Sequence, residues 1–199
     1  MQLNLHEINK VVINLPERSE RLIRFKNEFN YLFDDTFHVV NGVKKENPML
    51  GIAEAHLNCI RLAKDKGWDK VLIMEDDLYI PAKEKARAYV DEAFKKVPDD
   101  WDIILGGVYY VRNQVKANNY WTRIGEFCAL HFYIVNSSCY DKLLTCDGTN
   151  HIDRWVGKLG LNCYVPSRFF AIQYDGFSDN VKKETNYNNT YLKAFNILK

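Results

Sequence analysis

Short apolar runs alternate with amphipathic stretches along most of the chain. Apolar runs bounded by turn residues predict strands at 11–15, 37–40, 71–77, 101–107, 127–136 and 163–173. Apolar residues spaced three or four apart predict helices at 17–29, 52–66, 83–96, 137–144 and 151–160. This alternation predicts an α/β domain with a mainly parallel central sheet flanked by helices.

The extent of the pattern predicts the domain organisation. Residues 1–180 form one predicted domain, since no linker interrupts the alternation. Residues 181–199 are polar and rich in Asn, so we expect a poorly ordered C-terminal tail. A chain of 199 residues is long enough to bury a proper hydrophobic core.

Composition and charge narrow the class of protein. The net charge of +1 gives no overall attraction to nucleic acid. The five cysteines, an odd number without a CxxC pair, predict buried thiols rather than a disulfide framework or a zinc site. No apolar run approaches about 18 residues and the N-terminus lacks an apolar signal core, so we expect a soluble cytoplasmic protein. Lysines and aromatic residues in the tail leave a weak association with a membrane surface open.

Three consecutive carboxylates, Glu75, Asp76 and Asp77, end the predicted strand VLIMEDD. Strand alternation predicts that Glu75 and Asp77 share one face. Two such charges about 4 Å apart repel by roughly 4 kcal/mol at an effective dielectric of about 20. Bound Mn²⁺ or Mg²⁺ would remove this cost, because both ions prefer carboxylate oxygens. The alternative is a solvated acidic turn.

The loop after the first predicted strand carries Asn14, Arg18 and Arg21. Arginine suits bidentate binding of phosphate, and a helix N-terminus adds positive potential. We therefore interpret these residues as contacts to a nucleotide. The alternative is a solvated helix face on which Glu17 and Glu20 pair with the arginines.

Two histidines and an aspartate are further candidates. His56, on the helix that leads into the acidic strand, is a candidate for hydrogen bonding to a nucleotide, although a structural role is the alternative. Asp153 is the candidate general base, which must lie within hydrogen-bond reach of an attacking hydroxyl. His151 is a candidate metal or phosphate contact. A helix N-cap is the alternative for this segment.

The segment QYDGFSDN supplies the last candidates, Gln173, Ser178 and Asp179. Its polar side chains suit a loop that binds phosphate or sugar, and a plain turn is the alternative.

The order of these motifs resembles glycosyltransferase family 25, which includes bacterial lipooligosaccharide galactosyltransferases and collagen galactosyltransferase domains. The motifs are VINLPERSERL, GIAEAHLNCIRLA, VLIMEDDLYI, WDIILGG, ALHFYIVN, HIDRW and AIQYDGFSDN, and they cover most of the chain. The resemblance implies a GT-A-like fold, a nucleotide-sugar donor, a divalent cation and inversion at the anomeric carbon.

The resemblance also implies roles for individual residues. Glu75, Asp76 and Asp77 match the family's acid motif, and Asn14, Arg18 and Arg21 match its nucleotide-side loop. His56 matches the histidine that follows the family's glycine, and Asp153 matches an aspartate before the last strands. Gln173, Ser178 and Asp179 match the closing motif. The chain departs from the family at Ala55, where a Ser is usual, and at Ala53 and Glu54, where a Gly-Cys pair is usual. It is also short for the family.

Together these observations predict a metal-dependent inverting glycosyltransferase. It would transfer galactose or glucose from a UDP-sugar to a glycan, a lipid-linked sugar, a protein or another hydroxyl acceptor. Glu75, Asp77 and His151 are the predicted metal contacts, and Asp153 is the predicted base. The predicted donor contacts are the other candidates: Asn14, Arg18, Arg21, His56, Asp76, Gln173, Ser178 and Asp179. Two alternatives stay open: a non-catalytic nucleotide- or sugar-binding module, and a metal-dependent phosphohydrolase or nuclease.

Overall fold

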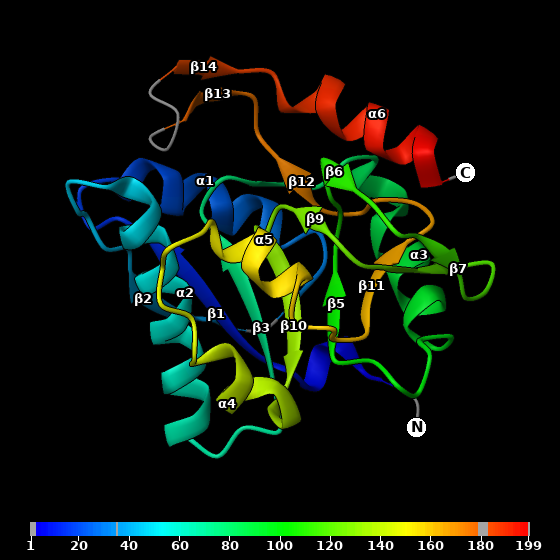
Figure 1. The fold of residues 1–199 in the computed structure, drawn as a ribbon. Coiled ribbons are helices and arrows are strands. Elements are labelled where there is room, and N and C mark those ends of the chain that lie inside the picture. Colours follow the sequence, from blue (N-terminus) through cyan, green and yellow to red (C-terminus); the bar gives the residue numbers. More distant parts are fainter. Residues whose placement is uncertain (1–2, 35, 179–182, 199) are drawn as a thin grey trace.

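A mixed eight-stranded sheet forms the centre of the molecule (Figure 1). The structure is a computed structural model that describes residues 3–34, 36–178 and 183–198. In spatial order the strands are β2 (His38–Asn41), β1 (Asn9–Asn14), β3 (Lys70–Glu75), β10 (Phe132–Asn136), β5 (Ile103–Leu105), β11 (Cys163–Pro166), β8 (Trp121–Ile124) and β7 (Val115–Lys116).

The strand directions refine the predicted sheet. Strand β1 pairs in parallel with β2 and β3, and β11 pairs in parallel with β5. Strand β10 lies between β3 and β5 and is antiparallel to both. The sheet is therefore mixed around a largely parallel core. The segment between β5 and β10 contains no helical crossover, and an antiparallel neighbour does not need one.

Helices cover both faces of this sheet, as the alternation predicted. They are α1 (Ser19–Phe29), α2 (Pro48–Asp65), α3 (Lys83–Phe94), α4 (Tyr140–Leu143), α5 (Ile152–Gly157) and α6 (Tyr187–Leu198), with short 3₁₀ turns η1 (Leu5–Glu7) and η2 (Ser137–Cys139). Helix α2 lies beside α4 and α5 on one face (Figure 1).

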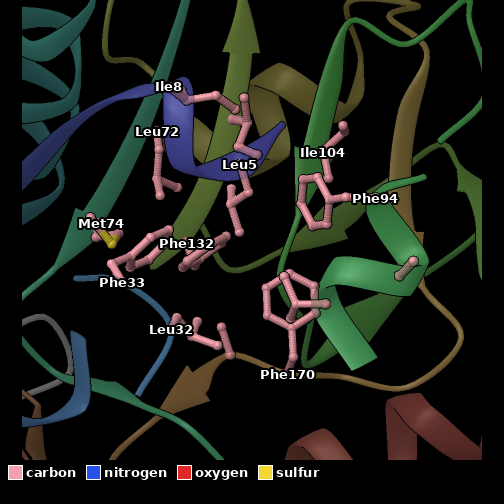
Figure 2. Packing of buried hydrophobic residues seen from close by; sticks show 14 of the residues in the cluster. Leu5, Ile8, Leu32, Phe33, Leu72, Met74, Phe94, Ile104, Phe132 and Phe170 are labelled. Carbon is pink, nitrogen blue, oxygen red and sulfur yellow. The ribbon is translucent and has the colours of Figure 1, made fainter. Parts of the chain in front are cut away.

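Strand alternation divides the buried residues into two cores. Val12, Leu72 and Phe132 belong to the core that α1 and α3 cover, and Figure 2 shows part of its aromatic packing, including Phe94 and Phe170. The second core contains alternate strand residues and the inner faces of α2, α4 and α5. Burial on both faces explains why the central strands are continuous apolar runs in the sequence.

Short strand pairs extend from one end of the sheet. They are β4 (Leu78–Tyr79) with β12 (Ile172–Gln173), β6 (Tyr110–Val111) with β9 (Phe127–Cys128), and β13 (Gly176–Ser178) with β14 (Lys183–Thr185). Of these short strands, β9 and β12 lie within the predicted strands 127–136 and 163–173, and the others were not predicted.

The expectation of a poorly ordered tail is wrong for the residues that the structure describes. Helix α6 packs against β12 and β6 (Figure 1). Tyr191 and Ala194, three residues apart, are both buried, and Phe195 contacts the ring of Phe169. A polar composition therefore conceals a narrow apolar face. Among the described residues, no helix is long and apolar enough to cross a membrane.

Candidate functional site

The three carboxylates lie at a turn rather than along a strand. Strand β3 ends at Glu75, and Asp76 and Asp77 form the turn into β4. The predicted strand 71–77 is therefore too long by two residues, and simple alternation does not describe these side chains. Each carboxylate instead has its own set of partners.

Asp76 is buried against the loop that follows β1. Its Oδ2 accepts a hydrogen bond of 2.7 Å from Nδ2 of Asn14, and its Oδ1 pairs with Nη1 of Arg21 at 3.1 Å. Burial raises the pKa of Asp76, and the charge of Arg21 opposes this shift. Asn14, itself 4% exposed, also donates to the carbonyl oxygen of Arg18. These contacts join the predicted nucleotide-side loop to the acidic turn.

The alternative for this helix face was that Glu17 and Glu20 pair with the arginines, and the described contacts of Arg21 and Glu17 differ from it. Arg21 pairs with Asp76, while Glu17 pairs with Lys44.

Glu75 is held from α2 and β10. A carboxylate only accepts hydrogen bonds, so Nε2 of His56 donates to Oε1 of Glu75, at 3.2 Å. The hydroxyl of Tyr133 lies 2.9 Å from Nδ1 of the same ring. Burial acts to raise the pKa of Glu75, but the hydrogen bond from His56 and the neighbouring imidazole and guanidinium groups together outweigh it, and the net pKa is lowered. Both ring nitrogens of His56 thus bond to protein groups.

Asp77 has the least compensated environment of the three. Its Oδ2 accepts a 3.1 Å hydrogen bond from Nε2 of Gln173, whereas its Oδ1 is buried with no hydrogen-bond partner among the described residues. Burial raises its pKa to about 8, with repulsion from Glu75 and Asp76 adding to the shift. A buried acceptor without a partner is costly, so this oxygen favours a proton or a cation.

A cleft of about 1040 Å³ opens over this turn. Glu75, Asp76, Asp77, His56, Gln173, Arg18 and Arg21 all line it. Further basic and aromatic side chains also line it, and sequence reasoning had not assigned them to the site: Arg24, Lys44, Lys45, Arg154, Tyr174 and Tyr187. The cleft therefore combines positive charge, carboxylates and aromatic rings.

Asp153 and His151 lie at the start of α5 and line the same cleft. Oδ2 of Asp153 accepts from the backbone N–H of Ala129 at 3.1 Å, and its Oδ1 accepts from the N–H of Arg154 at 2.7 Å. His151 is the N-cap residue, is exposed, and makes no capping hydrogen bond with its side chain. In the part of the chain that the structure describes, no three His, Cys, Asp or Glu side chains are grouped to hold a metal ion. His151 is thus not assembled with Glu75 and Asp77 as a three-ligand set.

Two candidates at the end of the domain stay predictions. Ser178 is the last residue of β13, and its side chain is outside what the structure describes, as is Asp179.

Some residues of the site had a signal in the sequence and others had none. Arg24 follows Arg21 by three residues on α1, so the helical period places both on one side. The hydroxyl of Tyr191 bonds to Gln173 and His131, yet its polar surroundings in the sequence predicted only a tail. Contacts across 55 residues or more, such as Arg21 with Asp76, have no local pattern.

Comparison with known proteins extends the description of the fold. The sequence matches no family model and no curated protein. Among solved structures, A197 from STIV is similar, with a TM-score of 0.50, 11% identity, and coverage of 89% of this chain and 93% of that one.

Two transferases are similar at lower scores. One is a mutant of Drosophila β-1,4-galactosyltransferase 7 in complex with manganese, UDP-Gal and xylobiose, with a TM-score of 0.42, 16% identity, and coverage of 90% of this chain and 69% of that one. The other is the inositol-1-phosphate CTP transferase from T. maritima, with a TM-score of 0.45, 16% identity, and coverage of 94% and 74%. The fold that this chain shares with A197 is an α/β fold with a mixed central sheet flanked by helices.

Proposed function

We propose that the protein transfers galactose or glucose from a UDP-sugar to a hydroxyl acceptor, in a metal-dependent reaction that inverts the anomeric carbon. The observation that carries this proposal is the buried Oδ1 of Asp77, which has no hydrogen-bond partner among the described residues and lies beneath a cleft of about 1040 Å³. The order of sequence motifs, which resembles glycosyltransferase family 25, supports the choice of reaction.

The acidic turn fits a divalent cation. Asp77 offers an oxygen without a hydrogen bond, and repulsion from Glu75 contributes to its raised pKa. Mg²⁺ is commonly held by one or two carboxylates together with substrate phosphates. Glu75 and Asp77 would hold Mn²⁺ or Mg²⁺ in this way, and the bound ion would neutralise negative charge that develops on the leaving diphosphate. His151 stays a predicted phosphate or metal contact.

The donor would lie along the basic side of the cleft. Arg18, Arg21 and Arg24 on or beside α1 and Lys44 and Lys45 after β2 line that region. Guanidinium groups bind phosphate oxygens bidentately, so this group of charges suits a nucleoside diphosphate. Asp76 and Asn14 would contact the donor, and they would also hold the loop after β1 against the acidic turn.

The acceptor would approach Asp153. Its carboxylate would take the proton of the acceptor hydroxyl while the hydroxyl oxygen bonds to the anomeric carbon. The bond from that carbon to the diphosphate oxygen breaks, and UDP leaves with the electron pair. Attack from the face opposite the leaving group inverts the configuration. A glycan, a lipid-linked sugar or a protein hydroxyl would serve as acceptor.

Calorimetry with UDP tests the binding part of this proposal. We expect UDP to bind in the presence of Mn²⁺, and Asp77→Ala to reduce that binding at least about tenfold, because one of two protein ligands is lost. Asp65→Ala, an exposed position at the end of α2 outside the cleft, is the matched control and should bind as the wild type does. Absence of UDP binding in the presence of Mn²⁺ would contradict the proposal.

A second candidate is a non-catalytic module that binds a nucleotide or sugar. Both oxygens of Asp153 accept backbone N–H groups, which also suits a structural carboxylate. Release of UDP from UDP-galactose or UDP-glucose separates the candidates. Turnover that Asp153→Asn abolishes supports the transferase, and UDP binding without any turnover supports the module.

A further inference from the structure

A chain of buried hydrogen bonds connects helix α6 to the acidic turn. Tyr191, on the inner face of α6, is 3% exposed, and its hydroxyl lies 3.0 Å from Nδ1 of His131 and 3.2 Å from Oε1 of Gln173. Nε2 of Gln173 donates to Oδ2 of Asp77 at 3.1 Å. Tyr191 of helix α6 is thus two hydrogen bonds away from the least compensated carboxylate of the cleft.

The donors and acceptors of this chain can be assigned. Nε2 of His131 lies 2.9 Å from the carbonyl oxygen of Ala171, which only accepts, so this nitrogen carries the proton. Burial lowers the pKa of His131 to about 4, which leaves the ring neutral and its Nδ1 an acceptor. The single hydroxyl proton of Tyr191 therefore faces two acceptors, Nδ1 of His131 and Oε1 of Gln173. No other donor to these two atoms is found among the described residues.

The consequence concerns the orientation of the Gln173 amide. With its Oε1 held by the Tyr191 hydroxyl, the amide presents Nε2 to Asp77 and fixes the carboxylate through Oδ2. That orientation leaves Oδ1, the unpartnered oxygen, available to a cation. Groups behind a metal ligand that fix its orientation strengthen metal binding, and their loss typically weakens it about 10–100-fold.

Glu75 has a separate anchor. The carboxylate of Glu75 is held by the side chain of His56, which the hydroxyl of Tyr133 contacts in turn, and neither residue belongs to the chain of Asp77. The N–H of Glu75 donates to the carbonyl oxygen of His131. A change at Tyr191 therefore acts on Asp77 without removing a hydrogen bond to Glu75.

We propose that Tyr191 is a positioning residue for Asp77, acting through Gln173, so that helix α6 is part of the metal-binding site. This inference rests on the proposed function, because it assigns Asp77 to a bound divalent cation. It predicts that the removal of one hydroxyl group on α6 weakens cation binding at Asp77, to which Tyr191 is linked through Gln173.

The test uses the full chain and measures the Mn²⁺ concentration that half-saturates UDP binding, by calorimetry. Tyr191→Phe should raise that concentration about tenfold or more. The matched control is Tyr140→Phe, which also removes a hydroxyl from a tyrosine that is 3% exposed, but whose hydrogen bond goes to the carbonyl of Trp68 outside the cleft. Tyr140→Phe should leave the Mn²⁺ requirement unchanged.

A double-mutant cycle keeps the test decisive if Tyr191→Phe is destabilised. Gln173→Leu breaks the same chain at its next residue and should raise the Mn²⁺ requirement by a similar or larger factor. The two substitutions together should cost no more than Gln173→Leu alone, because both interrupt one connection. Effects that multiply would overturn the inference.

Failure of the proposed function and failure of the positioning role give different results in this experiment. A wild-type protein that binds no UDP with Mn²⁺ would overturn the proposed function and this inference with it. Wild-type binding together with an unchanged Mn²⁺ requirement in Tyr191→Phe would overturn the positioning role alone.

Discussion

Asp77 illustrates how the environment of a single residue controls the chemistry of the site. Burial raises its pKa to about 8, and the neighbouring Glu75 and Asp76 contribute repulsion. Its folded-state pKa is therefore well above that of an unfolded aspartate, 3.8. Between these two values the folded protein binds more protons than the unfolded chain. Without metal, the ionisation of Asp77 therefore destabilises the fold as pH rises.

The pH dependence of stability tests this environment. The Asp77 contribution is fully present below about pH 4 and is lost as pH rises towards about 8, with a slope of at most about 1.4 kcal/mol per pH unit. Asp77→Asn lacks the ionisation, so the difference in unfolding free energy, variant minus wild type, should increase from about pH 5 to about pH 7. Urea denaturation without divalent cations measures it. A difference that does not change with pH would contradict the raised pKa.

At the scale of elements, the start of α2 shapes the basic side of the cleft. Asn47 caps this helix by accepting from the N–H of Met49, and Pro48 is its first residue. Gly51 packs so closely that an added Cβ would lie 2.2 Å from the carbonyl oxygen of Val43. This contact holds the segment with Lys44 and Lys45 against the helix, and a backbone oxygen has little freedom to move away.

Gly51→Ala should therefore destabilise the protein and disturb the cleft together. We expect a loss of unfolding free energy of about 1–3 kcal/mol, typical of overpacking, and weaker UDP binding. Arg61→Ala, at an exposed position of the same helix, should change stability by less than about 0.5 kcal/mol. Urea denaturation and calorimetry measure the two effects. Gly51→Ala with wild-type stability would show that the close contact does not constrain the helix.

At the scale of the molecule, segments from both ends of the chain meet at one cleft. The loop after β1 supplies Arg18, the turn after β3 supplies the carboxylates, and α6 supplies Tyr187. A ligand bound in this cleft would contact segments that are distant in sequence, and α6 contributes to the cleft wall through Tyr187.

Hydrogen exchange with and without UDP and Mn²⁺ should reveal this arrangement. We expect slower amide exchange in the loop after β1, in the turn 75–77 and in α6 when the ligands bind. A ligand that binds only the folded protein makes local opening of these segments less frequent. Helix α4, at a distance from the cleft lining, is the internal control and should not change. Protection confined to α1 would contradict a site that includes α6.

The sequence by itself determined the local features of this protein. Apolar runs that are buried on both faces, and amphipathic periods of three or four residues, predicted the main strands and the helices α1 to α5, because these patterns depend only on neighbouring residues. The same reasoning placed the three carboxylates at the end of the predicted strand 71–77, although Asp76 and Asp77 lie in the turn after β3. It predicted the α/β class, although the direction of β10 and the helix α6 were not foreseen.

Only the tertiary structure decided which side chains meet. His56 contacts Tyr133 from 77 residues away, and Asp77 contacts Gln173 from 96 residues away. Hydrogen bonds over such separations depend on strand order and helix docking, which no local period encodes. In the part of the chain that the structure describes, the same long-range packing leaves one oxygen of Asp77 buried without a partner, on which the proposed affinity for a cation depends.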